Sequence, residues 1–365
     1  MSSRPTQSVL FLIVFIFLVA CQPAPPPVLP NMLVEVAGEA QVLRKGHSEW
    51  VPITLGAELQ PGDTLLVSGG AAVFCGNETQ WEASPKLVPD NKNYTVTCSE
   101  GRVPSPEAGI SIVRYPEGTD IEQIPYALSP RSGFVLSDRP ILRWDLVPGV
   151  ETYTVTLQSD DRKTRPAVSV SGNVLPYPSE WAVLDANNAA YSLRVKGEVQ
   201  RTDEGEIDGE GFSLLADDKA QQVGLFSERL HERGLSSPSE ALLLAHLYLH
   251  EEYNLHSETV ELLLAVPDGD QIVAVQRLLG QTYLEMGLPE EATATYSQAL
   301  TLAEGVNLPE EQATAHLGLS LAACIQADKE EASSHRKDAE TLYEQMGWPE
   351  EDVEALLTEV DEKCG

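Results

Sequence analysis

The sequence predicts a multidomain protein with two all-β domains followed by an all-α helical array, and two changes of pattern along the chain indicate this. Over residues 33–103 and 133–216, apolar residues alternate with polar ones between Gly, Pro and Asn/Asp turns, which is typical of half-buried strands. From residue 217 to residue 365 the apolar period becomes helical and a motif recurs. With 365 residues, 42% of them hydrophobic, the chain is long enough for two or three packed domains.

The N-terminus has the pattern of an exported chain. Residues 9–20 form an unbroken apolar run, which at about 1.5 Å per helical residue is too short to cross a hydrocarbon core about 30 Å thick. A short polar start, an apolar core and small residues before a cleavage point are typical of a secretory signal peptide, here residues 1–20. The four residues Leu-Val-Ala-Cys that end at Cys21 resemble the bacterial lipobox. The resemblance implies cleavage before Cys21 and acylation of its side chain; the alternative is an ordinary signal peptide.

Proline dominates residues 21–32, which favours a stiff, extended spacer after the anchor. A multiply acylated cysteine holds a protein stably at a bilayer. We therefore expect a bacterial envelope protein that is bound through Cys21 to the extracytoplasmic side of a membrane. A net charge of −32 repels phosphate backbones, so nucleic acid is not an expected partner.

The remaining cysteines are Cys75, Cys98, Cys324 and Cys364. An even number of cysteines in an exported chain suggests disulfides, and four cysteines allow three pairings. Proximity in the sequence favours Cys75 with Cys98 and Cys324 with Cys364. The spacings do not suit a zinc site.

Residues 33–103 carry a run of glycine, tryptophan, Gly-x-x-Leu and Gly-Asp before a strand of small residues. The members of this run are Gly38, Trp50, Gly56, Leu59, Gly62, Asp63, Leu65 and Ala71. The run resembles the FecR-type domain, whose best-known members transmit a transport signal to a cytoplasmic sigma factor through a membrane helix. The resemblance implies an all-β fold outside the cytoplasm. Since the sequence has no second membrane helix, the signalling role is not implied.

Residues 104–132 are rich in Pro, Ser, Gly and acids and predict a linker. The strands of residues 133–216 include Leu184 and Tyr191, whose spacing resembles the fibronectin type III pattern. The resemblance implies a β-sandwich in which the Tyr191 hydroxyl bonds to the backbone. We interpret Trp144, Leu184 and Tyr191 as core residues.

The recurring motif of residues 217–365 is Leu-Gly-x-x-Tyr followed by Ala-x-x-x-Tyr, with Gly280 and Tyr296 among its members. It resembles the tetratricopeptide repeat, with further copies that start at Leu244 and Leu317. The resemblance implies stacked helix pairs in which small residues lie where helices meet and tyrosines fill the gaps. Residues 351–362 would form a capping helix.

The tetratricopeptide resemblance also implies a groove that holds an extended segment of a partner protein. The candidate groove residues are His246, His250, Arg277, Gln281 and Glu285. His246 and His250 are four apart on a predicted helix, but no carboxylate stands at a facing position, so we interpret them as surface histidines. Neither a metal ion nor a cofactor is expected.

No catalytic motif of the common hydrolase, nucleotide-binding or metalloprotease types occurs in the sequence, so an enzyme is not expected. The predicted function is a non-enzymatic protein–protein interaction scaffold for other envelope proteins or peptides. Two alternatives remain open. The repeats could serve only to oligomerise or space the domains, or the β domains could bind cell-wall glycan through exposed aromatic residues such as Trp50 and Trp81.

Overall fold

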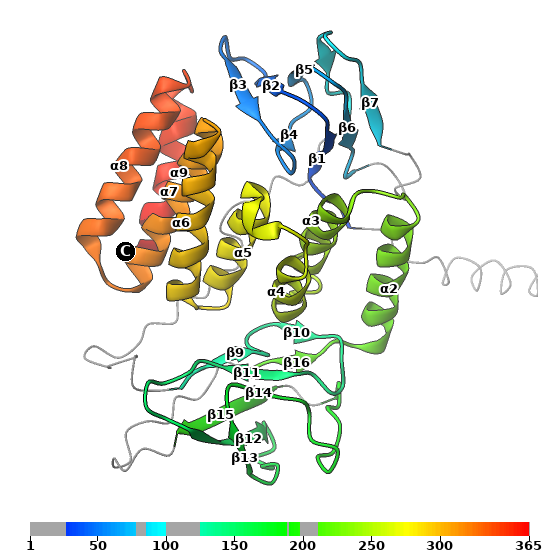
Figure 1. Ribbon diagram of the computed structural model, residues 1–365, viewed down its shortest axis with the longest axis vertical. Helices are drawn as coiled ribbons and strands as arrows, with labels where there is room; N and C mark the ends of the chain where they lie inside the picture. Colours follow the sequence, from blue (N-terminus) through cyan, green and yellow to red (C-terminus); the bar gives the residue numbers. More distant parts are fainter. Residues whose placement is uncertain (1–26, 78–84, 100–124, 188–189, 198–210, 365) are drawn as a thin grey trace, which may run out of the picture.

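The computed structural model describes residues 27–77, 85–99, 125–187, 190–197 and 211–364. A β-rich N-terminal part precedes a C-terminal run of helices, as the sequence predicts (Figure 1). The predicted signal peptide, Cys21 and Trp81 lie outside the described residues. Among the helices that are described, none combines the length and the hydropathy that a membrane crossing requires.

The first β region, residues 27–99, consists of two antiparallel sheets of four strands each. In sheet order the first sheet contains β4 (Glu58–Leu59), β1 (Asn31–Val36), β6 (Ala71–Phe74) and β7 (Lys86–Val88). The second contains β3 (Trp50–Ile53), β2 (Ala40–Leu43), β5 (Thr64–Val67) and β8 (Tyr94–Thr95). Buried and partly exposed residues alternate along β2, β3 and β5, which is the pattern of a sheet with one face in the core.

A disulfide joins Cys75, directly after β6, to Cys98, beyond β8, and thereby ties the two sheets together. This is one of the pairs that sequence proximity favours. Between β4 and β5, Gly62 has a φ of 96°, a left-handed conformation that favours glycine. The turn brings the buried carboxylate of Asp63 back onto the backbone N–H of Gln60, at 2.9 Å.

The second β region, residues 125–215, contains two three-stranded sheets and one parallel pair. One sheet has β14 (Val174–Leu175), β11 (Leu142–Trp144) and β9 (Ala127–Ser129), and the other has β13 (Val168–Ser171), β12 (Thr152–Ser159) and β15 (Tyr191–Gly197). The parallel pair is β10 (Phe134–Val135) with β16 (Ser213–Leu214).

The core of the second β region contains the residues interpreted as core from the sequence. Trp144, Leu184 and Tyr191 are all buried. The hydroxyl of Tyr191 accepts a hydrogen bond from the backbone N–H of Asp185 at 2.7 Å. A buried phenol needs such a polar partner, and this bond fixes the chain between the turn at Asp185 and strand β15.

The boundary predicted between linker and second β region requires a correction. Strand β9 lies within residues 104–132, which were predicted as linker, and Tyr126 and Arg131 beside it are buried. The composition of this segment is polar and proline-rich, but the strand pairs with β11 and its flanking residues contact the helices. Long-range contacts therefore order a segment whose local sequence favours a linker.

The helical array comprises residues 217–364; its first helices lie between the two β regions, and its last helices lie beside the first β region (Figure 1). Its α-helices are α2 (Asp217–His231), α3 (Ser237–Tyr248), α4 (His256–Leu264), α5 (Val273–Glu285), α6 (Pro289–Gly305), α7 (Pro309–Ile325), α8 (Lys329–Gln345) and α9 (Glu350–Cys364). Proline at the first position of α6 and α7 suits a helix start, because its missing N–H would have no partner there. From α5 to α8, each helix packs against the next one along the chain.

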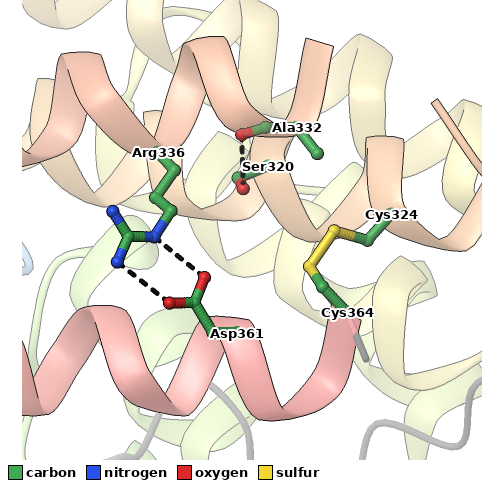
Figure 2. Close-up of a disulfide and its surroundings, with 6 residues drawn as sticks. All are labelled: Ser320, Cys324, Ala332, Arg336, Asp361 and Cys364. Atoms are coloured by element: carbon green, nitrogen blue, oxygen red, sulfur yellow. Dashed lines mark hydrogen bonds and ion pairs between the residues drawn. A yellow bond between two sulfur atoms is a disulfide. The ribbon is translucent and has the colours of Figure 1, made fainter. Parts of the chain in front are cut away.

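A disulfide and an ion pair join the last helix, α9, to the rest of the array (Figure 2). A disulfide joins Cys324 of α7 to Cys364 of α9, again a pair that sequence proximity favours. Arg336 of α8 donates two hydrogen bonds to the carboxylate of Asp361, at 2.8 and 2.9 Å (Figure 2). Helix α9 is thus held by both neighbouring helices.

Candidate functional site at the interfaces of the helical array

Most of the residues predicted to line a peptide groove are buried, and His250 is half-buried. His246, Gln281 and Glu285 are 7%, 9% and 5% exposed, and the Arg277 side chain is 12% exposed. His250 lies beyond the end of α3, so it does not share a helix with His246 as predicted. The interpretation of His246 as a surface histidine is also wrong.

Internal contacts occupy the three groove candidates on α5. Arg277 binds carboxylates of the first β region and of α7. The side chain of Gln281 donates a hydrogen bond to Glu285 at 3.0 Å, and Glu285 lies 3.3 Å from Nε2 of His256 at the start of α4. Since these side chains already have partners within the chain, they do not present an open groove.

The first β region contacts the N-terminal halves of α3, α5 and α7, and we call this contact the first interface. Arg44, after β2, lies at its centre. Its guanidinium donates two hydrogen bonds to Glu310 of α7, at 2.8 and 2.5 Å, and another to Asp63 at 2.7 Å. Burial disfavours the charged guanidinium, but Glu310 and Asp63 outweigh this effect and hold the pKa of Arg44 above its ordinary value.

A second arginine crosses the first interface from the other side. Arg277 of α5 lies 3.5 Å from Glu58 of β4 and 3.1 Å from Glu311 of α7. Burial would lower the pKa of Arg277, but Glu311 and Glu58 raise it above its ordinary value. Two arginines, one from each part, therefore bind carboxylates in an environment with little water, where charged hydrogen bonds are strong.

Further close contacts join the two sides of the first interface. Gly56 has a φ of 84° and packs so closely against Ala274 of α5 that a methyl group at this position would overlap it. Ser239 of α3 donates a hydrogen bond to the carbonyl of Val34 in β1. The ring of His47 meets Trp348, between α8 and α9, edge-on with ring centroids 5.3 Å apart.

Apolar packing also runs through the first interface without a break. One cluster of buried apolar side chains includes Leu59 and Leu65 from the first β region together with Tyr296 and Leu317 from the array. A shared core of this kind resembles the interior of one domain more than a transient contact. The first β region and the array are therefore expected to unfold together.

The second β region contacts the starts of α4 and α6 and the end of α5, and we call this contact the second interface. Arg131, only 2% exposed, donates a hydrogen bond from Nε to the carbonyl of Met286 at 2.7 Å. The hydroxyl of Tyr126 donates to Glu291 of α6 at 2.8 Å. The backbone N–H of Leu136 donates to the carboxylate of Glu258 in α4 at 2.6 Å.

Glu258 gives the second interface an expected pH dependence. Burial raises the pKa of Glu258 to about 7, whereas an unfolded glutamate titrates near about 4.3. The folded state therefore binds this proton more tightly, so its stabilising effect is complete at low pH and declines as the pH rises from about 4.5 to about 7. Glu258→Gln keeps an oxygen acceptor for the N–H of Leu136 but does not titrate. The variant should lack the loss of about 2 kcal/mol in the free energy of unfolding that the original chain shows between pH 5 and pH 7.5, measured by urea unfolding at both values.

A matched control lies on the same helix. Glu261 has a side chain that is 48% exposed and lies 3.7 Å from Arg143. Glu261→Gln should leave the difference in stability between pH 5 and pH 7.5 close to that of the original chain. Equal pH dependence in the Glu258→Gln variant and the original chain would contradict the assignment.

Apart from Arg277, which was predicted to line a groove, the residues that make the two interfaces were not predicted to do so from the sequence. Asp63 and Gly56 were noted only as parts of a motif, and Arg44, Glu58 and Glu258 were not noted at all. Arg44 and Glu310 are 266 positions apart, so no local spacing connects them. One sequence feature could have indicated a buried contact. Arg277 is a charged residue on an apolar helix face, and such a residue usually has a partner of opposite charge.

Three further side chains could together hold a metal ion. His316 of α7 and His335 and Asp338 of α8 have ligand atoms that all lie within 4.8 Å of one another. These residues were not singled out from the sequence, because His316 is 19 positions from His335 and the three match no ligand motif.

Comparisons with known proteins find little similarity in sequence or structure. No protein-family model matches the sequence, and no curated protein matches it. Among solved structures, the chain is similar to the β-1,2-glucanase from Parabacteroides distasonis, with a TM-score of 0.18 and 12% sequence identity. The match covers 89% of this chain and 50% of the glucanase chain.

This match corrects one expectation from the sequence. The chain was expected not to be an enzyme, and its match to a glycoside hydrolase contradicts that expectation, which we withdraw. A TM-score of 0.18 carries no argument for a shared fold or for an activity on glucans, so no reaction is assigned.

Proposed function

We propose that this chain is a lipid-anchored, extracytoplasmic protein of the bacterial cell envelope that acts as a protein-interaction scaffold through its helical array. In this proposal the first β region is a FecR-like domain, the second is a fibronectin type III-like sandwich and the array consists of tetratricopeptide-like repeats. Its partners are other envelope proteins or peptides, and a lipid on Cys21 attaches it to the membrane.

The observation that carries the proposal is that the array binds two other parts of the chain through different surfaces. Arg44 and Arg277 form ion pairs across the first interface, and Arg131 donates to a backbone carbonyl across the second. Helical repeats that already hold two folded regions in place have the geometry of a scaffold. The buried α5 side chains serve these internal contacts, so an outside partner would use surfaces that remain exposed.

The outer helix α8 offers such a surface. Glu330 and Glu344 lie near its two ends and are exposed, and the helix packs on α7 through Ala332 and Ala339, which are buried. These two exposed carboxylates favour contact with basic residues of a partner.

Affinity purification of the full-length, acylated chain from native membranes tests the scaffold proposal. We expect an envelope protein to co-purify in a fixed ratio, and the double substitution Glu330→Lys and Glu344→Lys to reduce its recovery. The matched control is Glu228→Lys with Glu232→Lys at exposed positions in and just after α2. A chain recovered alone, or an equal loss of partner in both double variants, would refute the proposed role of α8.

Anchoring has a separate test. Cys21→Ala should move the full-length chain from the membrane fraction to the soluble fraction, because a multiply acylated cysteine is the proposed attachment. Immunoblotting of the two fractions measures the shift. Gln22→Ala, which keeps the cysteine, should stay with the membranes, and a Cys21→Ala chain that also stays there would exclude lipid anchoring at this residue.

A further inference from the structure

Two histidines and an aspartate converge between α7 and α8. His316 projects from the middle of α7, and its Nδ1 lies 2.9 Å from Nδ1 of His335 in α8. Asp338 follows His335 by three positions, so both lie on the same face of α8. One ligand atom from each of the three residues lies within 4.8 Å of the other two.

The spacing and the donor types suit a zinc ion. Zinc takes imidazole nitrogens and carboxylate oxygens at about 2.0–2.2 Å, so two nitrogens bound to one tetrahedral zinc ion lie about 3.3 Å apart. The observed 2.9 Å between the two Nδ1 atoms is a few tenths of an ångström shorter, so a small outward movement of the two rings would admit the ion. Three protein ligands leave a fourth position for water, and a small movement of the exposed Asp338 side chain would complete the set.

The surroundings of the two rings favour metal binding. Nε2 of His335 lies 3.9 Å from the carboxylate of Glu331, one turn earlier on α8. At this distance the carboxylate forms no hydrogen bond, but it lies on the side of the ring from which a carboxylate usually orients a metal-bound histidine.

The contact between α7 and α8 does not depend on the histidine pair. Ala332 and Ala339 of α8 are buried, and Ser320 of α7 donates a hydrogen bond to the carbonyl of Ala332 at 2.9 Å (Figure 2). The pair is only partly buried, which leaves a path for an ion. A net charge of −32 also raises the local concentration of cations near the chain.

We propose that His316, His335 and Asp338 form a zinc site that joins α7 to α8. The ion would bridge two helices of the array, one of which, α8, also carries the exposed Glu330 and Glu344. Zinc would stabilise the folded chain, because the ligands come together only when α7 and α8 pack.

Isothermal titration of ZnCl2 into the metal-free, full-length chain in detergent tests the proposal. We expect one tightly bound Zn²⁺ per chain and a melting temperature that rises with zinc concentration. His316→Gln and Asp338→Asn should each abolish the tight binding and the shift in melting temperature. Replacement of zinc by Co²⁺ should give the visible absorption bands of a tetrahedral site with nitrogen and oxygen ligands.

The matched control is His231→Gln, which alters an exposed histidine whose Nδ1 lies 3.1 Å from the Glu240 carboxylate on the array surface. This variant should bind zinc as the original chain does. Melting temperatures in EDTA will show whether the His316→Gln chain is folded. Weak binding of several ions per chain, unchanged by His316→Gln, would mean scattered surface binding and would overturn the site.

Discussion

Arg277→Met is expected to lower the free energy of unfolding by about 3–5 kcal/mol, the range for removing one partner of a buried ion pair. Arg277 and the carboxylates of Glu58 and Glu311 are each at least three-quarters buried, at 12%, 22% and 13% side-chain exposure. Methionine fills most of the volume of the arginine stem but leaves both carboxylates without their cation. Urea unfolding at pH 7.5 of the full-length chain measures the loss.

The pH dependence of the free energy of unfolding gives a second test of the role of Arg277. Burial raises the pKa of Glu58, and Arg277 is the strongest influence that lowers it. Without the arginine, the folded-state pKa of Glu58 rises further above the unfolded value. A raised carboxyl pKa stabilises the folded state at low pH and loses this effect as the pH rises, so the Arg277→Met chain should recover part of its stability at pH 5.

An exposed arginine in the same array supplies the control. Arg336 and Asp361 have side chains that are 32% and 54% exposed (Figure 2). Arg336→Met should cost at most about 1 kcal/mol, because water and salt screen a surface pair. If Arg277→Met costs no more than Arg336→Met, the first interface does not hold the β region on the array as described.

Features with a local cause could be predicted from the sequence. The change from alternating to helical periodicity near residue 217 marks the border between the β-rich part and the array, and α2 begins at Asp217. The fibronectin type III resemblance of Leu184 and Tyr191 implied a hydrogen bond between the Tyr191 hydroxyl and the backbone, and the N–H of Asp185 donates such a bond to this hydroxyl. Each of these features depends on residues that are close along the chain.

The interfaces could not be predicted in the same way. Arg277 was predicted to line an open groove, because the repeat spacing describes only how one helix pair packs on the next. It does not predict which other part of the chain covers the groove. In the structure one partner of Arg277 is Glu58, in the first β region. Single-sequence patterns report periodicity within an element, and they do not report which distant element supplies the opposite charge.

The second large effect is expected at Gly318. The Tyr296 ring lies between Gly280 of α5 and Gly318 of α7, and a methyl group at Gly318 would overlap three of its ring carbons. Gly318→Ala should lower the free energy of unfolding by about 3 kcal/mol, because overlap in a packed core forces the ring and the helices to move. This loss should occur although alanine favours a helix over glycine by about 1 kcal/mol.

Two comparisons isolate the overlap from the helix preference. Gly224 of α2 has open space where a methyl group would be added, so Gly224→Ala should stabilise the chain by up to about 1 kcal/mol. In a Tyr296→Leu background, where the smaller side chain leaves room, Gly318→Ala should change from destabilising to neutral or stabilising. If Gly318→Ala still lowers the free energy of unfolding in the Tyr296→Leu background, the loss cannot come from overlap with the tyrosine ring.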